Sequence, residues 1–556
     1  MIRSLYILLL SVCFSATAQK GLIAEKAMVV SAREEASKIG TDIMKQGGNA
    51  FDAMIATQFA LAVAYPYAGN ISGGGFMVYR KSDGKTGTLD FREKAPMAAT
   101  KNMYLDAAGN VIPGKSTETA LAVGVPGTIA GLFEVHKKFG SLPMATLIKP
   151  AIALAEKGIR ITEYQETQIN NNKELIVALN GDKTLFAKCF KTNDTIRYPA
   201  LAETLKRISK NGSDEFYKGE TGQKLIAYLN KKGGVMTMKD LSSYKAKWRK
   251  PLTFKYRDLQ VISMSPPSSG GICLAQILKM IEPYDVAGLG HNSEKYIQLL
   301  TEAERRSYAD RNFYLGDPDF VKIPQQQLLD KDYLKKRMAG FSFEKATKSS
   351  DIAKGKVAFY ESNETTHYSI VDAKGNAVAV TTTLNGAFGS KLYCDELGFF
   401  LNNEMDDFSS KPGTANYYGL IGAEANSIAP GKRMLSSMTP TIVERNNKLL
   451  MLLGTPGGST IITSVLQTIL NVSEFKMGMQ EAVNAPRFHH QWLPDEVDFE
   501  PGKFDSGLLE SLRLKGYNVD EKNLPVIGKV DAIMLQPDGR LEGGADKRGD
   551  DSAAGF

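Results

Sequence analysis

The chain has 556 residues, 43% of them hydrophobic and 23% charged, which is typical of a soluble globular protein and unlike a disordered or fibrous one. This length is enough for one large layered domain or for two to three smaller ones. The 68 Lys and Arg residues are scattered among 61 Asp and Glu residues, and no basic block alternates with aromatic residues. The charge pattern therefore excludes an obvious nucleic-acid-binding surface.

The first residues predict export. Arg3 precedes an apolar run from Leu5 to Ala16, and Ala16-Thr17-Ala18 forms an A-x-A cleavage site. The run is short for a membrane span. We expect residues 1–18 to be a cleaved secretory signal and the protein to be periplasmic or secreted. An uncleaved anchor and a lipid on Cys13 are the alternatives, and Val12 is a poor residue to precede a lipidated cysteine.

Three cysteines remain after this cleavage. They are Cys189, Cys273 and Cys394. An odd number without a CxxC spacing indicates neither a disulfide framework nor a zinc site, although a single disulfide stays open.

Hydrophobic periodicity and turn residues predict the elements in chain order. Paired strands are expected over 75–91 around a turn at 82–84, and an extended segment over 256–264. The predicted helices are 24–66 with a break at Gly47-Gly48-Asn49, 126–157, 198–230, 269–281 and 293–312. Residues 345–364 are polar and rich in Lys and Ser, which predicts a flexible connector.

A β-hairpin is predicted directly after this connector. Residues 365–371 and 377–383 have strong strand propensity, and Gly375 suits the left-handed last position of a three-residue loop. Val371 then faces Ala377, and counting back along both strands puts Thr365 opposite Thr383. Directly opposed side chains have Cβ atoms about 4.5–5.5 Å apart, so the two hydroxyls can form a hydrogen bond. By itself such a pair is adequately explained as sheet stabilisation.

The position of Thr365 favours a chemical role. If the bond between Glu364 and Thr365 is cut, Thr365 gains a free α-amine beside its own hydroxyl. That amine can act as the general base for the hydroxyl, directly or through water. An α-amine has a pKa near ~8, so part of it is neutral near neutral pH. We therefore predict self-cleavage before Thr365.

Several long motifs resemble the γ-glutamyltransferase family of N-terminal-nucleophile hydrolases. They are S-G-G-G-F-M at 72–77, D-F-R-E at 90–93, T-T-H-Y-S-I-V-D at 365–372, L-N-N-E-M-D-D-F at 401–408, K-R-M-L-S-S-M-T-P at 432–440, G-T-P-G-G-S at 454–459 and N-A-P-R-F-H-H-Q-W at 484–492. The resemblance covers the whole mature chain. It implies an α+β fold, the four-layer αββα sandwich, and a heterodimer of a large chain, 19–364, and a small chain, 365–556.

The resemblance also implies the residues of the reaction centre. Thr365 matches the nucleophile and Thr383 the threonine that bonds it, in agreement with the predicted register. Gly457 and Gly458 match the oxyanion hole, whose backbone N–H groups hold the charge that develops during attack. A phosphate-binding loop is a poor alternative for these glycines because no Lys follows them.

The substrate head group is implied to lie among charged and polar side chains. Arg92, Ser436 and Ser437 match the site for its α-carboxylate, and a guanidinium can grip a carboxylate through two hydrogen bonds. The ammonium site is matched by Asn385, Glu404 and Asp407, where many bacterial relatives have Gln in place of Glu404. Tyr418, in a lid-like segment over 412–422, matches an aromatic that closes over the substrate, although a plain surface loop is a fair alternative.

The implied activity is acyl transfer from glutathione or another γ-glutamyl compound to water, an amino acid or a dipeptide. No cofactor and no metal are expected, and His489 and His490 are interpreted as structural because neighbours on a strand point to opposite faces. Two alternatives stay open: a cephalosporin or glutaryl acylase on the same scaffold, and a catalytically inactive binding protein. Arg92 and Asp407 argue against the acylase, since its substrates lack the amino-acid head group.

Overall fold

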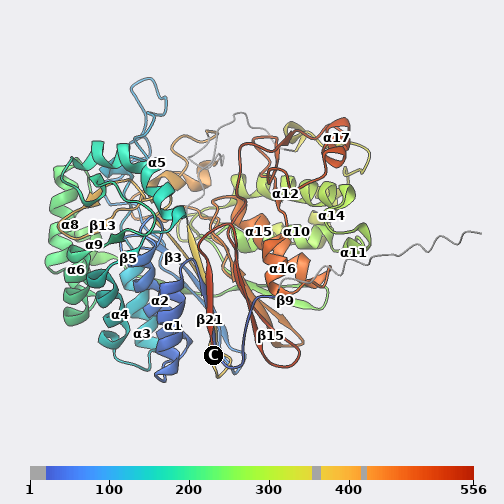
Figure 1. The fold of residues 1–556 in the computed structure, drawn as a ribbon. Helices are drawn as coiled ribbons and strands as arrows, with labels where there is room; N and C mark the ends of the chain where they lie inside the picture. The colour runs from blue at the N-terminus through green and yellow to red at the C-terminus, as the bar shows by residue number, and fades with distance from the viewer. Residues whose placement is uncertain (1–19, 353–364, 415–421) are drawn as a thin grey trace, which may run out of the picture.

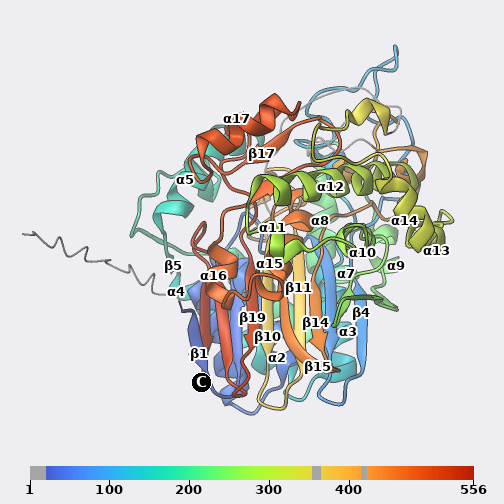
Figure 2. The same cartoon turned by 90° about the vertical axis from the view of Figure 1, so that its right-hand side faces the viewer.

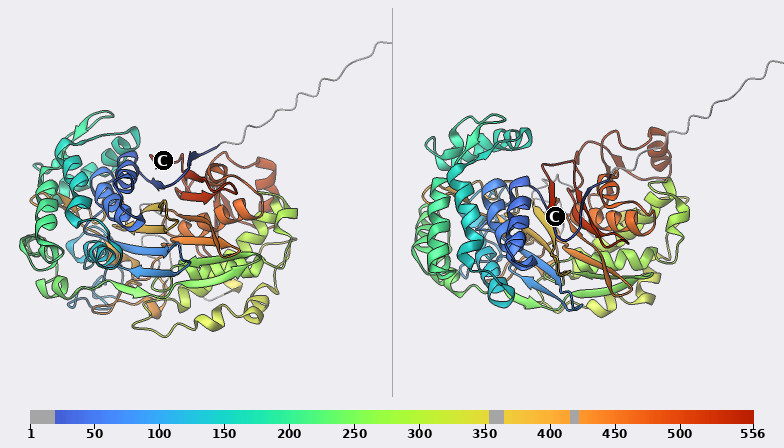
Figure 3. Two further views of the ribbon diagram at one scale, coloured as in Figure 1. Left: turned by 90° about the horizontal axis from the view of Figure 1, so that it is seen from below. Right: turned by 60° about the horizontal axis from the view of Figure 1, so that its bottom comes forward.

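Two seven-stranded sheets pack face to face at the centre of the molecule, and helices cover the outer face of each (Figure 1). The computed structural model describes residues 20–352, 365–414 and 422–556. Viewed along the layers, the order is helices, sheet, sheet, helices (Figure 3). The predicted α+β sandwich of four layers is confirmed.

The first sheet, here called the β10 sheet, carries the predicted hairpin in its middle. Its strand order is β21 (Ser552–Gly555), β2 (Met28–Ser31), β10 (Thr366–Val371), β11 (Ala377–Thr383), β3 (Gly74–Arg80), β4 (Thr86–Asp90) and β7 (Lys247–Arg249). Every ladder in it is antiparallel.

The second sheet, here called the β15 sheet, lies against it, and the strand axes of the two sheets are roughly aligned (Figure 2). Its order is β1 (Leu22–Ala24), β20 (Leu541–Ala545), β19 (Asp531–Leu535), β15 (Lys448–Gly454), β14 (Thr441–Arg445), β9 (Leu259–Ser263) and β8 (Leu252–Tyr256). Three small sheets lie outside the sandwich: β5 (Ile159–Arg160) with β6 (Thr195–Ile196), β12 (Tyr393–Cys394) with β13 (Phe399–Phe400), and β16 (Phe488–His489) with β17 (Val497–Phe499) and β18 (Val519–Asp520).

Helices from the first half of the chain cover the β10 sheet. They are α1 (Glu34–Lys45), α2 (Ala50–Ala64), α3 (Thr128–Phe139), α4 (Met144–Lys157), α5 (Glu163–Asn180), α6 (Pro199–Asn211), α7 (Asp214–Tyr217), α8 (Glu220–Lys231) and α9 (Met238–Ser243). The β15 sheet is covered by α10 (Gly270–Ile281), α11 (Val286–Leu289), α12 (Glu294–Tyr314), α13 (Gln325–Leu328), α14 (Lys331–Met338), α15 (Thr460–Ser473), α16 (Met479–Asn484) and α17 (Ser506–Leu514).

Three apolar layers hold the sandwich together. One lies between the sheets, where Val30, Phe76 and Val78 of the β10 sheet meet Ile442 and Leu452 of the β15 sheet. The other two lie between each sheet and its helices. The innermost helix, α2, is buried along its whole length, because helices and the β10 sheet surround it. Its sequence is correspondingly apolar on every face.

Most predicted elements are confirmed, including the strand pair over 75–91 and the helices near 269–281 and 293–312. The helical segments predicted over 126–157 and 198–230 are divided, the first into α3 and α4 and the second into α6, α7 and α8. Of the extended segment predicted over 256–264, residues 259–263 form β9. The helix predicted from residue 24 is wrong at its start. Residues 28–31 form β2, which pairs with both β10 and β21, and α1 begins only at Glu34. Val29 and Val30 suit a strand buried on both faces, and this tertiary pairing overrides the helical spacing that follows them.

The predicted connector is anchored where the structure describes it. Ser349 is buried, its N–H donates to Asp495 at 2.8 Å, and its carbonyl accepts from the Trp492 ring N–H at 3.0 Å. A 3₁₀ turn covers Ser349–Asp351. The prediction of flexibility is therefore wrong for residues 345–352, while 353–364 lie outside the described residues. The predicted signal at 1–18 also lies outside them. Within the described ranges, no helix is long and apolar enough to cross a membrane.

Candidate active site

The predicted site residues that the structure describes lie at one end of the sandwich. Antiparallel pairing places the start of one strand beside the end of the next, so segments far apart in sequence meet there: the residues before β10 and β14, and the residues after β4, β11 and β15. They surround one small cavity, lined by Arg92, Arg311, Thr365, Thr383, Asn385, Asp407, Ser436, Ser437, Met438, Gly458 and Ile461.

The hairpin has the predicted register. Thr366 pairs with Thr382 and Val371 with Ala377, and Gly375 closes the loop with φ +84°. The Thr365 hydroxyl donates to Oγ1 of Thr383 at 3.3 Å, and both side chains are buried. The predicted contact between these two hydroxyls is thus present, one residue beyond the end of the ladder.

Thr383 Oγ1 is also fixed from the other side. It accepts the backbone N–H of Asn385 at 2.7 Å. Asn385 has φ +77°, a left-handed conformation that asparagine tolerates better than most residues. Its side-chain amide donates to the carbonyl of Asn403 at 3.1 Å. This turn therefore places Asn385 beside the threonine pair.

Gly457 and Gly458 lie between β15 and the first turn of α15. Their φ angles are +134° and +56°, and a Cβ on Gly457 would lie 2.3 Å from the Thr460 hydroxyl oxygen. Both positions therefore favour glycine. In the described part of the chain, neither glycine N–H donates to another backbone oxygen. These donors at a helix N-terminus are suited to hold a developing negative charge.

Arg92 is completely buried and contacts three carboxylates. Its guanidinium pairs with Glu404 and with Asp407 through short contacts, and Glu93 lies 3.6 Å away. Asp407 lines the cavity, whereas Glu404 is fully buried and is not among its lining residues. The residues assigned to opposite ends of the head group are thus in direct contact with one another.

The pKa values of this cluster follow from burial and crowding. Burial alone would lower the pKa of Arg92, but the charges of Glu404, Asp407 and Glu93 outweigh it and raise that pKa. Burial raises the pKa of Glu93 to about 8 and that of Glu404 well above its ordinary value. One guanidinium cannot balance three ionised carboxylates in a buried site, so part of the cluster stays protonated.

Ser436 and Ser437 reach the cavity from the segment before β14. Oγ of Ser436 accepts the Met438 N–H at 3.1 Å, and Oγ of Ser437 accepts from Nη2 of Arg311 at 3.0 Å. Arg311, at the end of α12, is one of three lining residues that sequence reasoning missed, together with Met438 and Ile461. Met438 lies within the motif at 432–440 but was given no role there. Arg311 and Ile461 lie in none of the quoted motifs, because their place in the cavity depends on how α12 and α15 pack.

Two predicted residues cannot be placed. Glu364 and Tyr418 lie outside the described residues. The ends of the lid-like segment are described: the Gly413 N–H donates to the carbonyl of Gly422 at 3.0 Å, and the Ala423 N–H to that of Asn312 in α12 at 3.0 Å.

His489 and His490 are buried and hydrogen-bonded. His489 bonds Oγ1 of Thr463 at 2.8 Å and Oε1 of Gln491 at 2.9 Å, and His490 bonds the carbonyl of Glu496 at 2.6 Å. Among the described residues no group of three or more His, Cys, Asp or Glu side chains could hold a metal ion, and the cysteines they include are unpaired.

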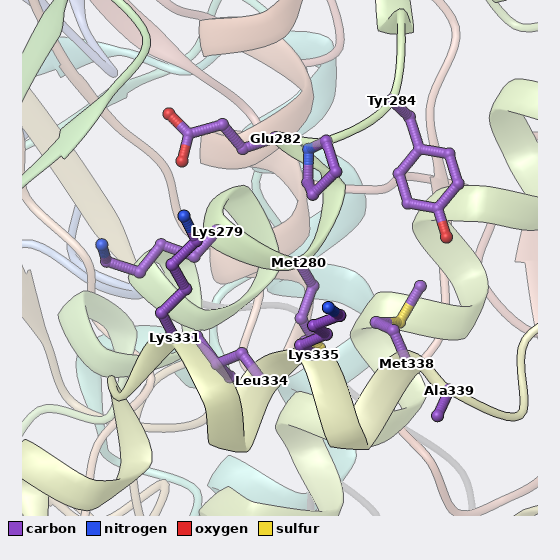
Figure 4. A pocket seen from close by; sticks show the side chains of 10 residues that line it. Lys279, Met280, Glu282, Tyr284, Lys331, Leu334, Lys335, Met338 and Ala339 are labelled. Atoms are coloured by element: carbon purple, nitrogen blue, oxygen red, sulfur yellow. The ribbon is translucent and has the colours of Figure 1, made fainter.

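A much larger cavity, of about 740 Å³, lies elsewhere, between the end of α10 and α14 (Figure 4). Its lining includes Lys279, Met280, Tyr284, Leu334 and Met338. The hydroxyls of Thr365 and Thr383 meet Gly458 instead at the small cavity. Chemistry, and not size, therefore identifies the candidate active site.

Known proteins resemble this chain over almost its whole length. The γ-glutamyltranspeptidase family model matches residues 36–556. A glutathione hydrolase proenzyme of Escherichia coli (strain K12) is 46% identical over 538 residues, covering 96% of this chain and 92% of that protein.

Two solved structures agree on the fold. A γ-glutamyltranspeptidase of Helicobacter pylori is 43% identical with a TM-score of 0.58, covering 61% of this chain and 96% of that one. A cephalosporin acylase from Bacillus halodurans shares the fold over 97% of both chains, with a TM-score of 0.85 at 24% identity. On the match of the family model and the extent of the first similarity, the chain belongs to the γ-glutamyltranspeptidase family.

Proposed function

We propose that the protein is a γ-glutamyltransferase and glutathione hydrolase that cleaves itself before Thr365. The observation that carries the proposal is the Thr365–Thr383 hydroxyl pair, which lines the same cavity as Gly458, Arg92 and Asp407. The name of the Escherichia coli relative, a glutathione hydrolase proenzyme, supports both the activity and the processing.

Processing uses the hydroxyl of Thr365 on its own preceding peptide bond. The Thr365 oxygen attacks the carbonyl carbon of Glu364, the C–N bond breaks, and the Thr365 nitrogen takes up the proton that the hydroxyl loses. Water then hydrolyses the resulting ester. The products are a large chain ending at the Glu364 carboxylate, 19–364 after signal removal, and a small chain, 365–556, that begins with the Thr365 α-amine. The two chains stay together as a heterodimer.

Turnover repeats this chemistry on the substrate. The α-amine of Thr365 accepts the hydroxyl proton while the oxygen attacks the γ-carbonyl carbon of the γ-glutamyl amide. The backbone N–H groups of Gly457 and Gly458 stabilise the oxyanion. The leaving amine takes the proton and departs, which leaves a γ-glutamyl ester on Thr365. Water, or the amine of an amino acid or dipeptide, then releases the acyl group.

The head group is recognised by charge. Its α-carboxylate would bind Arg92 with the hydroxyls of Ser436 and Ser437, and its α-ammonium would bind Asp407, Asn385 and Glu404. Arg92 and Asp407 already contact each other. The substrate head group carries a carboxylate, which would pair with Arg92, and an ammonium, which would pair with Asp407. The Arg92–Asp407 contact is then replaced by two ion pairs, and each buried charge keeps a partner. Tyr418 is proposed to close over the bound substrate.

We also propose that the protein is exported to the periplasm or secreted, with loss of residues 1–18. The support is the charged start, the apolar run and the A-x-A site. N-terminal sequencing of the large chain should give Gln19, and a large chain that starts at Met1 would contradict export by this signal.

Two measurements on the purified protein test the proposed function. Mass spectrometry after incubation with glutathione should show two chains and a small chain carrying one γ-glutamyl group. An intact single chain without an adduct would instead favour an inactive binding protein. In the second measurement, the enzyme should prefer γ-glutamyl anilide to glutaryl anilide, which lacks the amine. The opposite preference would favour an acylase.

A further inference from the structure

Arg311 stands out among the buried arginines. Its side chain lies in the last turn of α12, is 4% exposed and lines the cavity beside Thr365. The fully buried Arg92, Arg305, Arg433 and Arg487 each pair with a carboxylate. In the described part of the chain, the hydrogen bonds of Arg311 go to neutral oxygens: Oγ of Ser269 at 3.0 Å, Oδ1 of Asn312 at 2.9 Å and Oγ of Ser437 at 3.0 Å.

A buried cation with no carboxylate within ion-pair distance is costly. Asp407 attracts Arg311 electrostatically, but Asp407 is already paired with Arg92. Burial lowers the pKa of Arg311, in contrast to Arg92. The position of this incompletely balanced charge is informative, because the cavity is where an anionic group of the substrate is proposed to bind. Arg92 already shares its charge with Glu404, Asp407 and Glu93. Arg311 is therefore the source of net positive charge at this wall.

Arg311 also fixes which way the Ser437 hydroxyl can act. A serine hydroxyl has one hydrogen to donate and accepts through its lone pairs. Because Ser437 Oγ accepts from Arg311, its own hydrogen is left to donate into the cavity that it lines. Ser436 Oγ accepts from the Met438 N–H in the same way. Both serine hydroxyls are thereby left to donate their hydrogens, and a carboxylate requires donors because it only accepts hydrogen bonds.

The same arginine supports the backbone of this segment. Nε of Arg311 donates to Oγ of Ser269. The Ser269 N–H and hydroxyl both donate to the carbonyl of Ser436, at 2.7 and 2.8 Å. A chain of hydrogen bonds thus connects α12, through Ser269, to the Ser436–Ser437 wall of the cavity.

We infer that Arg311 is a positioning and specificity-determining residue for the α-carboxylate of the substrate: it orients the Ser437 hydroxyl and supplies the positive charge that Arg92 alone does not leave available. This inference rests on the proposed γ-glutamyl substrate. It adds a second cation to the carboxylate side of the head-group site and predicts that the enzyme's preference for that carboxylate depends on α12.

Two anilides separate this role from a structural one. γ-Glutamyl anilide carries the α-carboxylate, and 4-aminobutyryl anilide has the same chain and amine without it. For Arg311→Gln we expect kcat/KM on the first substrate to fall roughly 10- to 100-fold, the effect of losing a hydrogen-bonded contact to a charged group. The loss should lie mostly in KM, and the second substrate should change less than about 3-fold by the same reasoning. Where the analogue is cleaved slowly, its inhibition constant gives the same comparison.

Arg306→Gln is the matched control. Arg306 lies on the same helix, is equally buried and pairs with Glu302. Its loss should lower the melting temperature and affect both substrates by the same factor. Arg311→Lys keeps the charge without the fork-shaped donors, and its selectivity should lie between that of the parent and Arg311→Gln.

The results distinguish a failure of the proposed function from a failure of the role inferred for Arg311. A parent enzyme that does not cleave γ-glutamyl anilide contradicts the proposed function. A parent that cleaves it, with an Arg311→Gln variant that is unchanged or loses equally on both substrates, overturns the role of Arg311. If Arg311→Gln fails to give two folded chains, the Ser269→Ala variant tests the role of Arg311 instead. It leaves the charge in place but removes the Nε contact, so a loss confined to γ-glutamyl anilide supports the inference and an equal loss overturns it.

Discussion

The reaction centre and the head-group site share one cavity but are built in different ways. Thr365 and Thr383 lie on neighbouring strands joined by a short loop, and their contact follows from the register of one hairpin. Arg92 and Asp407 come from loops 315 residues apart, and their contact depends on how the whole sandwich closes. The first region consists of neutral hydroxyls and backbone N–H groups, whereas the second consists of buried charges.

Because the two regions differ, they contribute differently to two reactions in the same cavity, self-processing and substrate turnover. Attack of Thr365 on its own preceding bond needs the hydroxyls and the oxyanion donors but no recognition of an amino-acid head group. Attack on a γ-glutamyl substrate needs both regions. Variants in the first region should therefore impair processing and turnover together, and variants in the second should impair turnover alone.

The largest effect is expected for Thr365→Ala. This substitution removes the nucleophile for both reactions, so the protein should remain a single chain without measurable activity. Denaturing gel electrophoresis and an anilide assay check this. If the pure variant still separates into two chains, Thr365 does not cut its own chain.

Asp407→Asn should separate the two regions most clearly. It keeps the volume and hydrogen-bonding capacity of the side chain but removes the charge that we propose meets the substrate ammonium. Losing one partner of a buried charge pair costs about 2–5 kcal/mol, so kcat/KM for γ-glutamyl anilide should fall roughly 30- to several-thousand-fold. Processing should proceed as in the parent.

Glutaryl anilide is the control for that variant, since it has no amine. Its slow cleavage should be nearly the same in the parent and in Asp407→Asn. If Asp407→Asn also blocks chain cleavage, the head-group site is not separate from the reaction centre and the comparison breaks down.

Thr383→Val tests the reaction centre with a smaller change. It keeps the shape of Thr383 and removes the hydroxyl that bonds Thr365. Losing one hydrogen bond to a reacting group should cost on the order of 1–3 kcal/mol, or about 5- to 150-fold in rate. Processing and turnover should both slow. A variant that matches the parent in both would reduce Thr383 to an ordinary strand residue.

The last prediction concerns stability and not activity: it follows the effect of pH on His367, the second residue of β10. Burial lowers the pKa of His367 to about 3 from the ordinary value of 6.5, and its ring bonds Thr381 at 2.8 Å. Between these values the unfolded chain binds a proton that the folded chain does not. The stability that His367 contributes is thus present above pH 6.5 and is lost as the pH falls, by about 1.4 kcal/mol per unit.

His367→Gln should therefore lose less stability than the parent on acidification. Melting temperatures of the processed protein at pH 7.5 and 5.0 measure the two slopes. Parallel slopes would show that His367 does not set the acid response. Selectivity between γ-glutamyl and glutaryl anilide should not change, because His367 lies outside the head-group site.

The sequence by itself determined the geometry of the reaction centre. The two-residue repeat of a strand and the glycine of a three-residue loop leave one register for residues 365–383, and the structure has that register. The family resemblance, which is a property of the sequence, pointed to Arg92, Asp407 and the glycine pair. Strand pairs and long amphipathic helices were likewise predictable, since they depend on neighbours in the sequence.

Tertiary structure alone decided the rest. Residues 28–31 became a strand because β10 and β21 pair with them on either side. Arg92, Glu404 and Asp407 form one cluster because two loops close over the same end of the sandwich. Arg311 reaches the cavity only because α12 packs behind Ser437. Charged residues and helix ends follow no periodic pattern in the sequence. Which of them come into contact is therefore decided only when the chain folds.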